Sequence, residues 1–338
     1  MADCATGNGL SGRRKALSRS LSFGLALVLT AWLACSAPHD NPLDPSLGGN
    51  VEGRVLTRRA TGIANAEVLV PAAGRVARTD SAGSFGLYGL PDGLLKFQLA
   101  ADGCVAESVV VALERGRIDK LDVYLDGLPY VQDCRFTTHR QGRDWPPNPL
   151  TYCRFTATAS DADGETDIDS VWVEIPAVGY ARRLDYDPDR QLFTRTLAAL
   201  LLPGQSLETL MGQSVLFKVA DQESAVVQAP PCYLSRIIEY LPEPVFPSGW
   251  ADTLRGDTTF IWHRFDHGFW VSYHCEIVRI EGGGPAGIAA TFDRPAPQDT
   301  TYLYYAAELT SGDYYWTVEA IDAFGNSARS PEERFHVN

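Results

Sequence analysis

Short runs in which apolar and polar residues alternate recur along most of this 338-residue chain. Residues 95–99, LKFQL, and residues 121–125, LDVYL, are two such runs. Because successive side chains of a β-strand point to opposite faces, this pattern is typical of strands that bury one face. The chain also contains 30 glycines and 21 prolines, which favour turns, and it shows no long amphipathic helix pattern. The sequence therefore predicts an all-β chain of tandem β-sandwich domains.

The first 34 residues have the composition of a bacterial signal peptide. A basic segment, residues 13–19, precedes the uncharged run 21–34, which is shorter than the roughly 20 apolar residues needed to span a bilayer. The run leads into Cys35, with a small residue directly before the cysteine, and this resembles the lipobox of bacterial lipoproteins. Trp32 stands where that family usually has leucine. The resemblance implies cleavage before Cys35 and a lipid on its sulfur. The alternative is an ordinary secretory signal that is cleaved nearby.

The segment after the anchor and the overall charge indicate a protein of the cell envelope. Residues 35–49 are rich in proline, aspartate and glycine, as expected of an extended tether. The formal net charge is −13, so we expect no nucleic-acid partner and no adsorption to anionic lipid by charge alone. Contact with the membrane would come through the lipid anchor. Ser36 stands where some bacterial lipoproteins carry the aspartate that retains them in the inner membrane, which favours the outer membrane or the cell surface.

A first domain is expected over residues 50–127. Its short segments VEGRV, IANAEV, TDSAGSF and GLPDG, which begin at residues 51, 63, 79 and 89, follow one another in a familiar order. Together they resemble the carboxypeptidase regulatory-like domain, a small transthyretin-like sandwich. That family is non-catalytic and accompanies peptidases, transporters and surface lipoproteins, so the resemblance implies no reaction. Cys104 stands where the family usually has an aromatic residue, and we expect a small buried thiol there.

Two further sandwiches are expected after the first. Residues 128–236 contain alternating runs and resemble an immunoglobulin-like sandwich in architecture, without the Cys…Trp…Cys spacing of true immunoglobulin domains. Farther on, residues 309–320, LTSGDYYWTVEA, match the tyrosine-corner strand of fibronectin type III domains, with Tyr314 as the corner residue. Residues 237–338 thus resemble that family, whose members act as spacer and adhesion modules.

The cysteines beyond the anchor match no metal-binding spacing. They are Cys104, Cys134, Cys153, Cys232 and Cys275. Cys134 and Cys232 flank the middle domain, and the first and last strands of immunoglobulin-like sandwiches often run side by side. We therefore predict a disulfide between them in the oxidising envelope, with Cys134–Cys153 as the alternative. Cys153 lies on the apolar face of its run, so we expect it to be a free thiol in the core.

One loop carries a cluster of carboxylates. Residues 160–169, SDADGETDID, contain Asp161, Asp163 and Asp167, and clustered carboxylate oxygens are the ligands that Ca²⁺ prefers. The spacing is not that of an EF-hand, because Gly164 comes too early. The alternative is a solvated hairpin turn that uses aspartate and glycine for their backbone freedom, and this alternative is favoured. We expect no other cofactor.

No catalytic motif appears in the sequence. There is no HExxH and no GxSxG, and His263 and His267 lie in a strand end and loop, where they do not share a helix face. The chain is therefore expected not to be an enzyme. Aromatic residues gather near the C-terminus, at Tyr302, Tyr304, Tyr305, Tyr314, Tyr315 and Trp316. They either form ordinary sandwich core, which is favoured, or leave an exposed face that could stack on sugar rings or on a protein.

These observations together predict a non-catalytic, lipid-anchored envelope protein that binds or spaces a protein partner. Two alternatives remain open. One is a carbohydrate-binding surface lipoprotein, and the other is an accessory subunit of an envelope enzyme or transporter.

The predicted anchor can be tested by replacing a single sulfur. Cys35→Ser should move the protein out of the membrane fraction or leave its leader uncleaved, because neither the lipid nor the cleavage site would form. Cell fractionation and intact-mass measurement provide the readout, and Cys4→Ser is the matched control. An unchanged mass and unchanged membrane association in the Cys35→Ser variant would contradict the lipobox interpretation.

Overall fold

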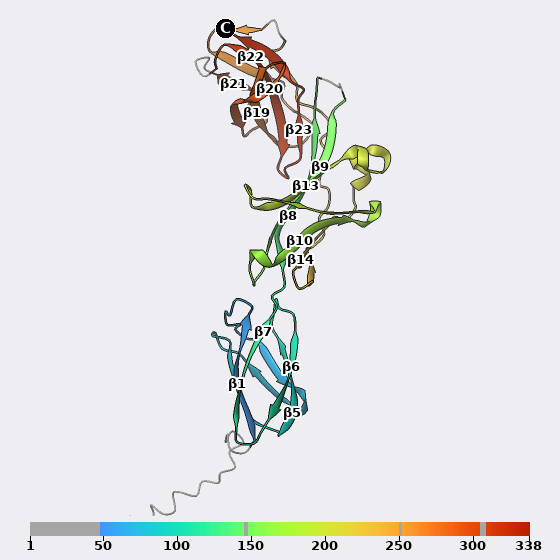
Figure 1. The fold of residues 1–338 in the computed structure, drawn as a ribbon. Coiled ribbons are helices and arrows are strands. Elements are labelled where there is room, and N and C mark those ends of the chain that lie inside the picture. Colours follow the sequence, from blue (N-terminus) through green and yellow to red (C-terminus); the bar gives the residue numbers. More distant parts are fainter. Residues whose placement is uncertain (1–47, 145–147, 250–251, 305–308) are drawn as a thin grey trace, which may run out of the picture.

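The computed structural model describes residues 48–144, 148–249, 252–304 and 309–338, and these residues form three β-sandwiches in a row (Figure 1). The predicted all-β fold is therefore confirmed. Cys35 and the predicted signal peptide lie outside the described residues. Within the described part of the chain, no helix is both long enough and apolar enough to cross a membrane.

The first domain packs a sheet of order β4-β1-β7 against a sheet of order β3-β2-β5-β6. Its elements are β1 (Gly49–Thr57), β2 (Glu67–Val70), η1 (Pro71–Ala73), β3 (Arg75–Arg78), β4 (Ser84–Leu90), β5 (Gly93–Ala100), β6 (Glu107–Leu113) and β7 (Ile118–Leu125). β1 begins one residue inside the segment that was expected to be tether. It runs parallel to β7, and a Cβ atom at Gly53 would lie 1.8 Å from the Leu121 carbonyl oxygen. Only glycine allows the two strands to approach so closely.

The second domain packs strands β12-β13-β9-β8 against β11-β10-β14-β15. Its strands are β8 (Tyr130–Gln141), β9 (Leu150–Ser160), β10 (Ile168–Ile175), β11 (Tyr180–Arg183), β12 (Asp185–Asp187), β13 (Leu192–Ala198), β14 (Leu216–Asp221) and β15 (Val226–Gln228). Its 3-10 turns are η2 (Glu165–Asp167), η3 (Pro176–Val178), η4 (Ala199–Leu201), η5 (Pro203–Gln205) and η6 (Leu207–Leu210). Phe155 and Phe217 meet edge to face in the core, with ring centroids 6.4 Å apart. Both rings are fully buried, as the alternation in the sequence predicts.

The third domain has a sheet of order β16-β18-β21 that faces strands β23-β22-β19-β20, and β24 pairs with β22 and β17. Its strands are β16 (Pro244–Phe246), β17 (Thr253–Leu254), β18 (Thr258–Trp262), β19 (Val271–Glu281), β20 (Gly284–Arg294), β21 (Thr301–Tyr304), β22 (Gly312–Asp322), β23 (Ser327–Arg329) and β24 (Glu333–Val337). Tyr314 is buried, and its hydroxyl donates to the Thr310 carbonyl oxygen over 2.8 Å. This bond is the tyrosine corner that the sequence predicted.

The second and third domains share one sheet. β23 pairs in parallel with β8, in the register Ser327↔His139 to Arg329↔Gln141, and this joins their strands into a ten-stranded sheet. Beside this pairing, the buried Asn326 accepts a bond from the Thr138 N–H over 2.9 Å and donates to Asp322 over 3.0 Å. The sequence predicted three separate sandwiches. It contains no local signal for this pairing, because the two strands lie far apart in the chain.

The Asn326 side chain should stabilise the contact between the second and third domains, which we call the second junction. Asn326→Ala would leave the buried Thr138 N–H without its acceptor, and an unsatisfied buried group costs about 1 to 3 kcal/mol. The Asp322 carboxylate would lose one donor but keep Arg236. Calorimetry of the chain should show a lower unfolding temperature for the transition that includes the third domain. The exposed Asn148 provides the control, and Asn148→Ala should leave the melting profile unchanged. Equal profiles for both variants would contradict a structural role for Asn326.

Candidate functional site: the carboxylate cluster between the first and second domains

Carboxylates from several segments meet where the first domain touches the second. Ligand-capable oxygens of Asp161, Asp163 and Asp167 all lie within 4.8 Å of one another. A second group with the same spacing consists of Asp126, Asp167 and Glu223, so Asp167 belongs to both. Asp126 directly follows β7 of the first domain, and Glu223 lies in the turn between β14 and β15 of the second. The structure thus brings together the three predicted aspartates and adds carboxylates from distant segments.

The loop that carries the predicted aspartates is not a solvated hairpin turn, so the favoured alternative is wrong. Residues 160–167 connect β9 to β10, which lie in opposite sheets of the second domain. Asp161 and Asp163 are only 7% and 6% exposed, because the loop faces the first domain. Asp161 Oδ1 accepts a bond from the Asp163 N–H over 2.7 Å, which fixes the turn locally.

Asp163 holds the two domains together. Its Oδ2 accepts a bond from the Gly127 N–H over 2.6 Å, and its Oδ1 accepts one from the Arg58 N–H over 2.7 Å. Both donors are backbone groups of the first domain: Arg58 directly follows β1, and Gly127 is the second residue after β7. Because both of its oxygens accept backbone N–H bonds, the Asp163 carboxylate is fixed in position and sets the approach of the second domain.

Other oxygens of the cluster have no such partner. The Oδ2 atoms of Asp161, Asp167 and Asp221 are buried and lack a hydrogen bond among the residues that the structure describes. Asp221 ends β14 and is 2% exposed, and its other oxygen accepts a bond from the Ala225 N–H over 2.7 Å. A buried carboxylate oxygen without a partner is costly, so each of these atoms requires a physical explanation.

Two arginines of the first domain partly neutralise the cluster. The Arg58 side chain pairs with Glu223, and its Nε lies 3.0 Å from Asp126 Oδ1, although the N–H is not aligned for a hydrogen bond. Arg59 packs over the loop, where a Cβ atom at Gly164 would lie 1.6 Å from a guanidinium nitrogen. The described carboxylates still outnumber these guanidinium groups, so the junction keeps an excess of negative charge.

Burial, together with the neighbouring carboxylates, raises the pKa values of several members of the cluster. Burial raises the pKa of Asp126 to about 6, and the nearby Asp221 and Glu223 add to the shift while Arg58 opposes it. Burial also raises the pKa values of Asp161 and Asp167. Cys104 lies beside the cluster and is half-buried, whereas the sequence predicted a buried thiol. Burial and the neighbouring aspartates raise its pKa.

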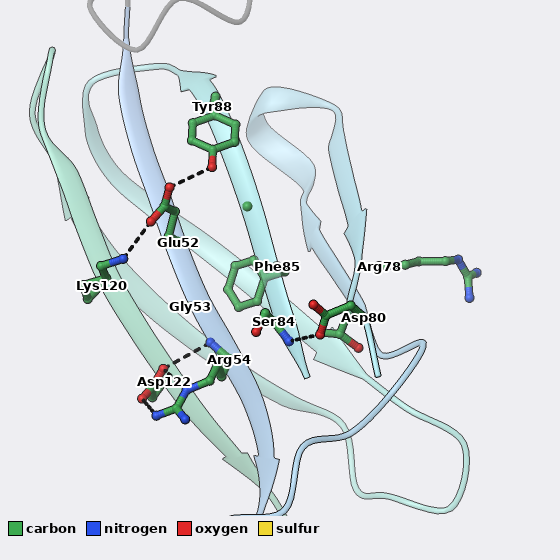
Figure 2. A pocket seen from close by; sticks show the side chains of 12 residues that line it. Glu52, Gly53, Arg54, Arg78, Asp80, Ser84, Phe85, Tyr88, Lys120 and Asp122 are labelled. Carbon is green, nitrogen blue, oxygen red and sulfur yellow. Dashed lines mark hydrogen bonds and ion pairs between the residues drawn. The ribbon is translucent and has the colours of Figure 1, made fainter. Parts of the chain in front are cut away.

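The first domain also carries a groove with a volume of about 750 Å³ (Figure 2). Its charged groups are paired across neighbouring strands. Lys120 Nζ lies 2.7 Å from Glu52, the Tyr88 hydroxyl donates to Glu52 over 2.8 Å, and Arg54 pairs with Asp122 at 2.7 Å. These exposed pairs contribute little free energy each, and their charges are already matched. The groove therefore offers a weaker case for a ligand than the junction.

The predicted disulfide partners lie together. The Sγ atoms of Cys134 and Cys232 are 3.2 Å apart, as two thiols in contact, and burial raises the pKa of Cys134 to about 12. Cys153 is buried with its Sγ 3.6 Å from the Leu197 carbonyl oxygen, on the core side of β9. The geometry favours the Cys134–Cys232 pairing over the alternative with Cys153, and the covalent bond itself stays a prediction.

The predicted aromatic face is mostly core. Tyr304, Tyr314 and Trp316 are buried, and Tyr302 stacks on Phe292 with ring centroids 4.0 Å apart. Tyr315 is half-buried, and Tyr305 lies outside the described residues. The favoured alternative, ordinary sandwich packing, therefore holds for the described members of this group.

His263 and His267, the two histidines that lie four residues apart, are not part of a potential metal site among the described residues. His267 stacks on Tyr240 with ring centroids 4.2 Å apart, and His263 lies in the loop that follows β18. Neither residue belongs to the potential metal-ligand groups found among the described residues.

Sequence reasoning missed Asp126, Asp221, Glu223 and Arg58. Each lies at or just beyond the end of a strand, and strand ends are where sandwich domains meet their neighbours. An acidic residue directly after an alternating run, as in Asp126-Gly127, was the available signal. The sequence could not show which strand ends would face each other.

No protein family and no curated protein matches this sequence. Solved structures that match include BcpA, the major pilin subunit of Bacillus cereus, at 10% identity and a TM-score of 0.29, over 83% of this chain and 91% of that chain. The FN1–FN3 domains of chicken CNTN1 match at 11% identity and a TM-score of 0.32, over 82% and 92%. The fibronectin(III)-like modules of Clostridium thermocellum CbhA match at 12% and 0.28, over 62% and 93%. Similarities of this size carry no inference about function.

Oxidised protein should contain the Cys134–Cys232 disulfide. Non-reducing peptide mapping after alkylation should find these two peptides linked, and Cys104 alkylated. The bond would close a loop of 98 residues, so the Cys134→Ser, Cys232→Ser double variant should lose up to about 4.7 kcal/mol in the free energy of unfolding. Alkylation of both cysteines in the unreduced protein would contradict the prediction. A Cys134–Cys153 link would establish the alternative pairing.

Proposed function

We propose that the mature chain is a non-catalytic, lipid-anchored envelope protein that holds its C-terminal domain away from the membrane to meet a protein partner. The observation that carries the proposal is the direction of the chain along the row, which begins at one end of the three domains and finishes at the other. β1 starts at the pole of the first domain opposite the junction, because Arg58, just after the end of β1, contacts Asp163. A lipid on Cys35 would therefore tether the row by its first domain.

The opposite pole belongs to the C-terminal end. β24 pairs with β22 so that Val337 faces Gly312, whereas the other end of β22 leads to Asn326 at the second junction. The chain thus enters the row at one pole and ends at the other (Figure 1). Such polarity suits a spacer, because the distance from the membrane then grows with each domain.

Both junctions are structured. The first is held by backbone donors on Asp163, and the second by the sheet that continues from β8 into β23. Buried hydrogen bonds at a junction restrict domain motion, which flexible linkers would leave free. A spacer requires this property, because a row that folds back on itself gains no reach.

Carbohydrate binding is the second candidate, and one hollow favours it. Tyr186 is 54% exposed and packs against Phe193, with ring centroids 5.0 Å apart, beside a hollow of about 750 Å³ on the second domain. Arg190 and Asp169 also line this hollow. An exposed aromatic ring beside polar side chains is a common arrangement for stacking on a sugar ring.

The spacer proposal predicts an extended shape in solution. A strand of about nine residues, at roughly 3.3 Å per residue, is about 30 Å long. Three domains of about this length in a row give a rod near 90 Å long. Small-angle X-ray scattering of the chain without its leader should then give a radius of gyration clearly above about 19 Å, the value for a compact globule of this length. A value near 19 Å would contradict the proposal.

The same protein tests the competing roles. Pull-down from solubilised membranes should recover a protein partner, and panels of peptide, ester, glycoside and phosphate substrates should show no turnover. Glycan-array binding that Tyr186→Ala abolishes would establish the carbohydrate-binding role instead. Turnover that a single loop substitution abolishes would overturn the non-catalytic assignment.

A further inference from the structure

We propose that the carboxylate cluster at the junction of the first and second domains binds Ca²⁺, and that the bound ion locks these two domains together. The core of the site consists of Asp161, Asp163 and Asp167. Asp167 also belongs to the second group, with Asp126 and Glu223, which contains residues of both domains. This inference does not depend on the spacer role, and it can fail separately.

The buried and unpartnered oxygens point to a ligand. Asp161 is 7% exposed and Asp221 is 2% exposed, yet the Oδ2 atom of each has no hydrogen bond within the described part of the chain. Asp221 lies beside Asp167, because it pairs with Ile168 across β10 and β14, and the next residue, Gln222, donates its N–H to the Asp167 carbonyl oxygen over 2.9 Å. Carboxylates that are buried without donors are either neutralised or coordinate a cation. A cation in the cluster would satisfy these oxygens together.

The donor set selects a hard cation. Both groups offer only carboxylate oxygens, which Ca²⁺ binds at 2.3 to 2.6 Å with six to eight ligands in flexible geometry. Two ligands on opposite sides of one Ca²⁺ then lie about 4.6 to 5.2 Å apart, which matches oxygens that all lie within 4.8 Å of one another. Zn²⁺ prefers nitrogen and sulfur, and Mg²⁺ requires a smaller, near-octahedral shell.

Asp163 would couple the ion to the domain junction. Its oxygens already accept bonds from the Arg58 and Gly127 N–H groups of the first domain. Each carboxylate oxygen can accept from a second direction, so Asp163 can retain these bonds while it contacts the ion. The ion would also relieve the repulsion among the aspartates, which at present opposes the closed junction.

The Arg58 side chain would compete with the ion for two of the carboxylates. It now pairs with Asp126 and Glu223, which form the outer group with Asp167. An ion that recruits these two carboxylates would release the guanidinium group toward solvent, where it is already 46% exposed. The outer group thus gives the ion a direct connection between the two domains.

Metal addition to the chelator-treated chain without its leader tests the proposal. Titration calorimetry should detect Ca²⁺ binding. At free Ca²⁺ of 100 times Kd, the Tm should rise by about 5 to 10 °C, because a ligand of the folded state stabilises it by mass action. Mg²⁺ at the same concentration should produce a smaller rise. A Tm that responds neither to Ca²⁺ nor to chelator would overturn the proposal, and an equal response to Mg²⁺ would overturn the choice of metal.

Matched variants separate binding from folding. Asp161→Asn and Asp167→Asn should abolish the Ca²⁺ response, while their Tm in chelator stays equal or rises, because a repelling charge is removed. Asp169→Asn is the control, since Asp169 lies in the same acidic run but is exposed and pairs with Arg183. Loss of the response in the Asp169→Asn variant, or its survival in the Asp161→Asn variant, would contradict the assigned ligands.

Hydrogen exchange tests the link between domains. Ca²⁺ should slow exchange of the Arg58 and Gly127 amides, which donate to Asp163, and Asp161→Asn should remove this protection. Amides of β19 in the third domain provide the internal reference and should not change. Ca²⁺ binding without added protection at Arg58 and Gly127 would show that the ion does not lock the domains.

Discussion

The long strand β8 is the element on which the row of domains depends. Along one edge it pairs with β9 inside the second sandwich, and along part of the other edge it pairs in parallel with β23 of the third. Because the backbone hydrogen bonds continue from one domain to the next, the third domain cannot swing freely without breaking them. Asn326 strengthens this constraint, because its buried amide bonds to Thr138 on one side and Asp322 on the other.

The first junction, between the first and second domains, consists mainly of charged side chains, whereas the second consists of paired strands. Asp163 connects the domains through backbone N–H groups, but the aspartates around it repel one another and are partly desolvated. A junction of this type is sensitive to what neutralises it, whether protons, arginine side chains or a cation. The row therefore combines one junction fixed by sheet pairing with another whose strength depends on its surroundings.

Much of the fold was predictable because the constraint is local. Alternation at Leu95, Phe97 and Leu99 identifies a strand with one buried face, and all three side chains are buried. The turn and corner residues around Tyr314 likewise identify the tyrosine corner within a single short segment. The loop at Asp161 and Asp163 was recognised as a possible Ca²⁺ ligand set, yet its burial was not, because the surface that covers it belongs to another domain.

The sequence by itself determined the strands, the turns and the number of sandwiches, since side-chain periodicity and turn chemistry act over a few residues. Only the tertiary structure decided which strand ends face one another. It placed Asp126 and Glu223 within reach of Asp167, the Cys134 sulfur beside that of Cys232, and β23 against β8. These contacts join residues that are distant in the chain. Their partners are chosen by how whole sandwiches pack, which no local pattern of residues records.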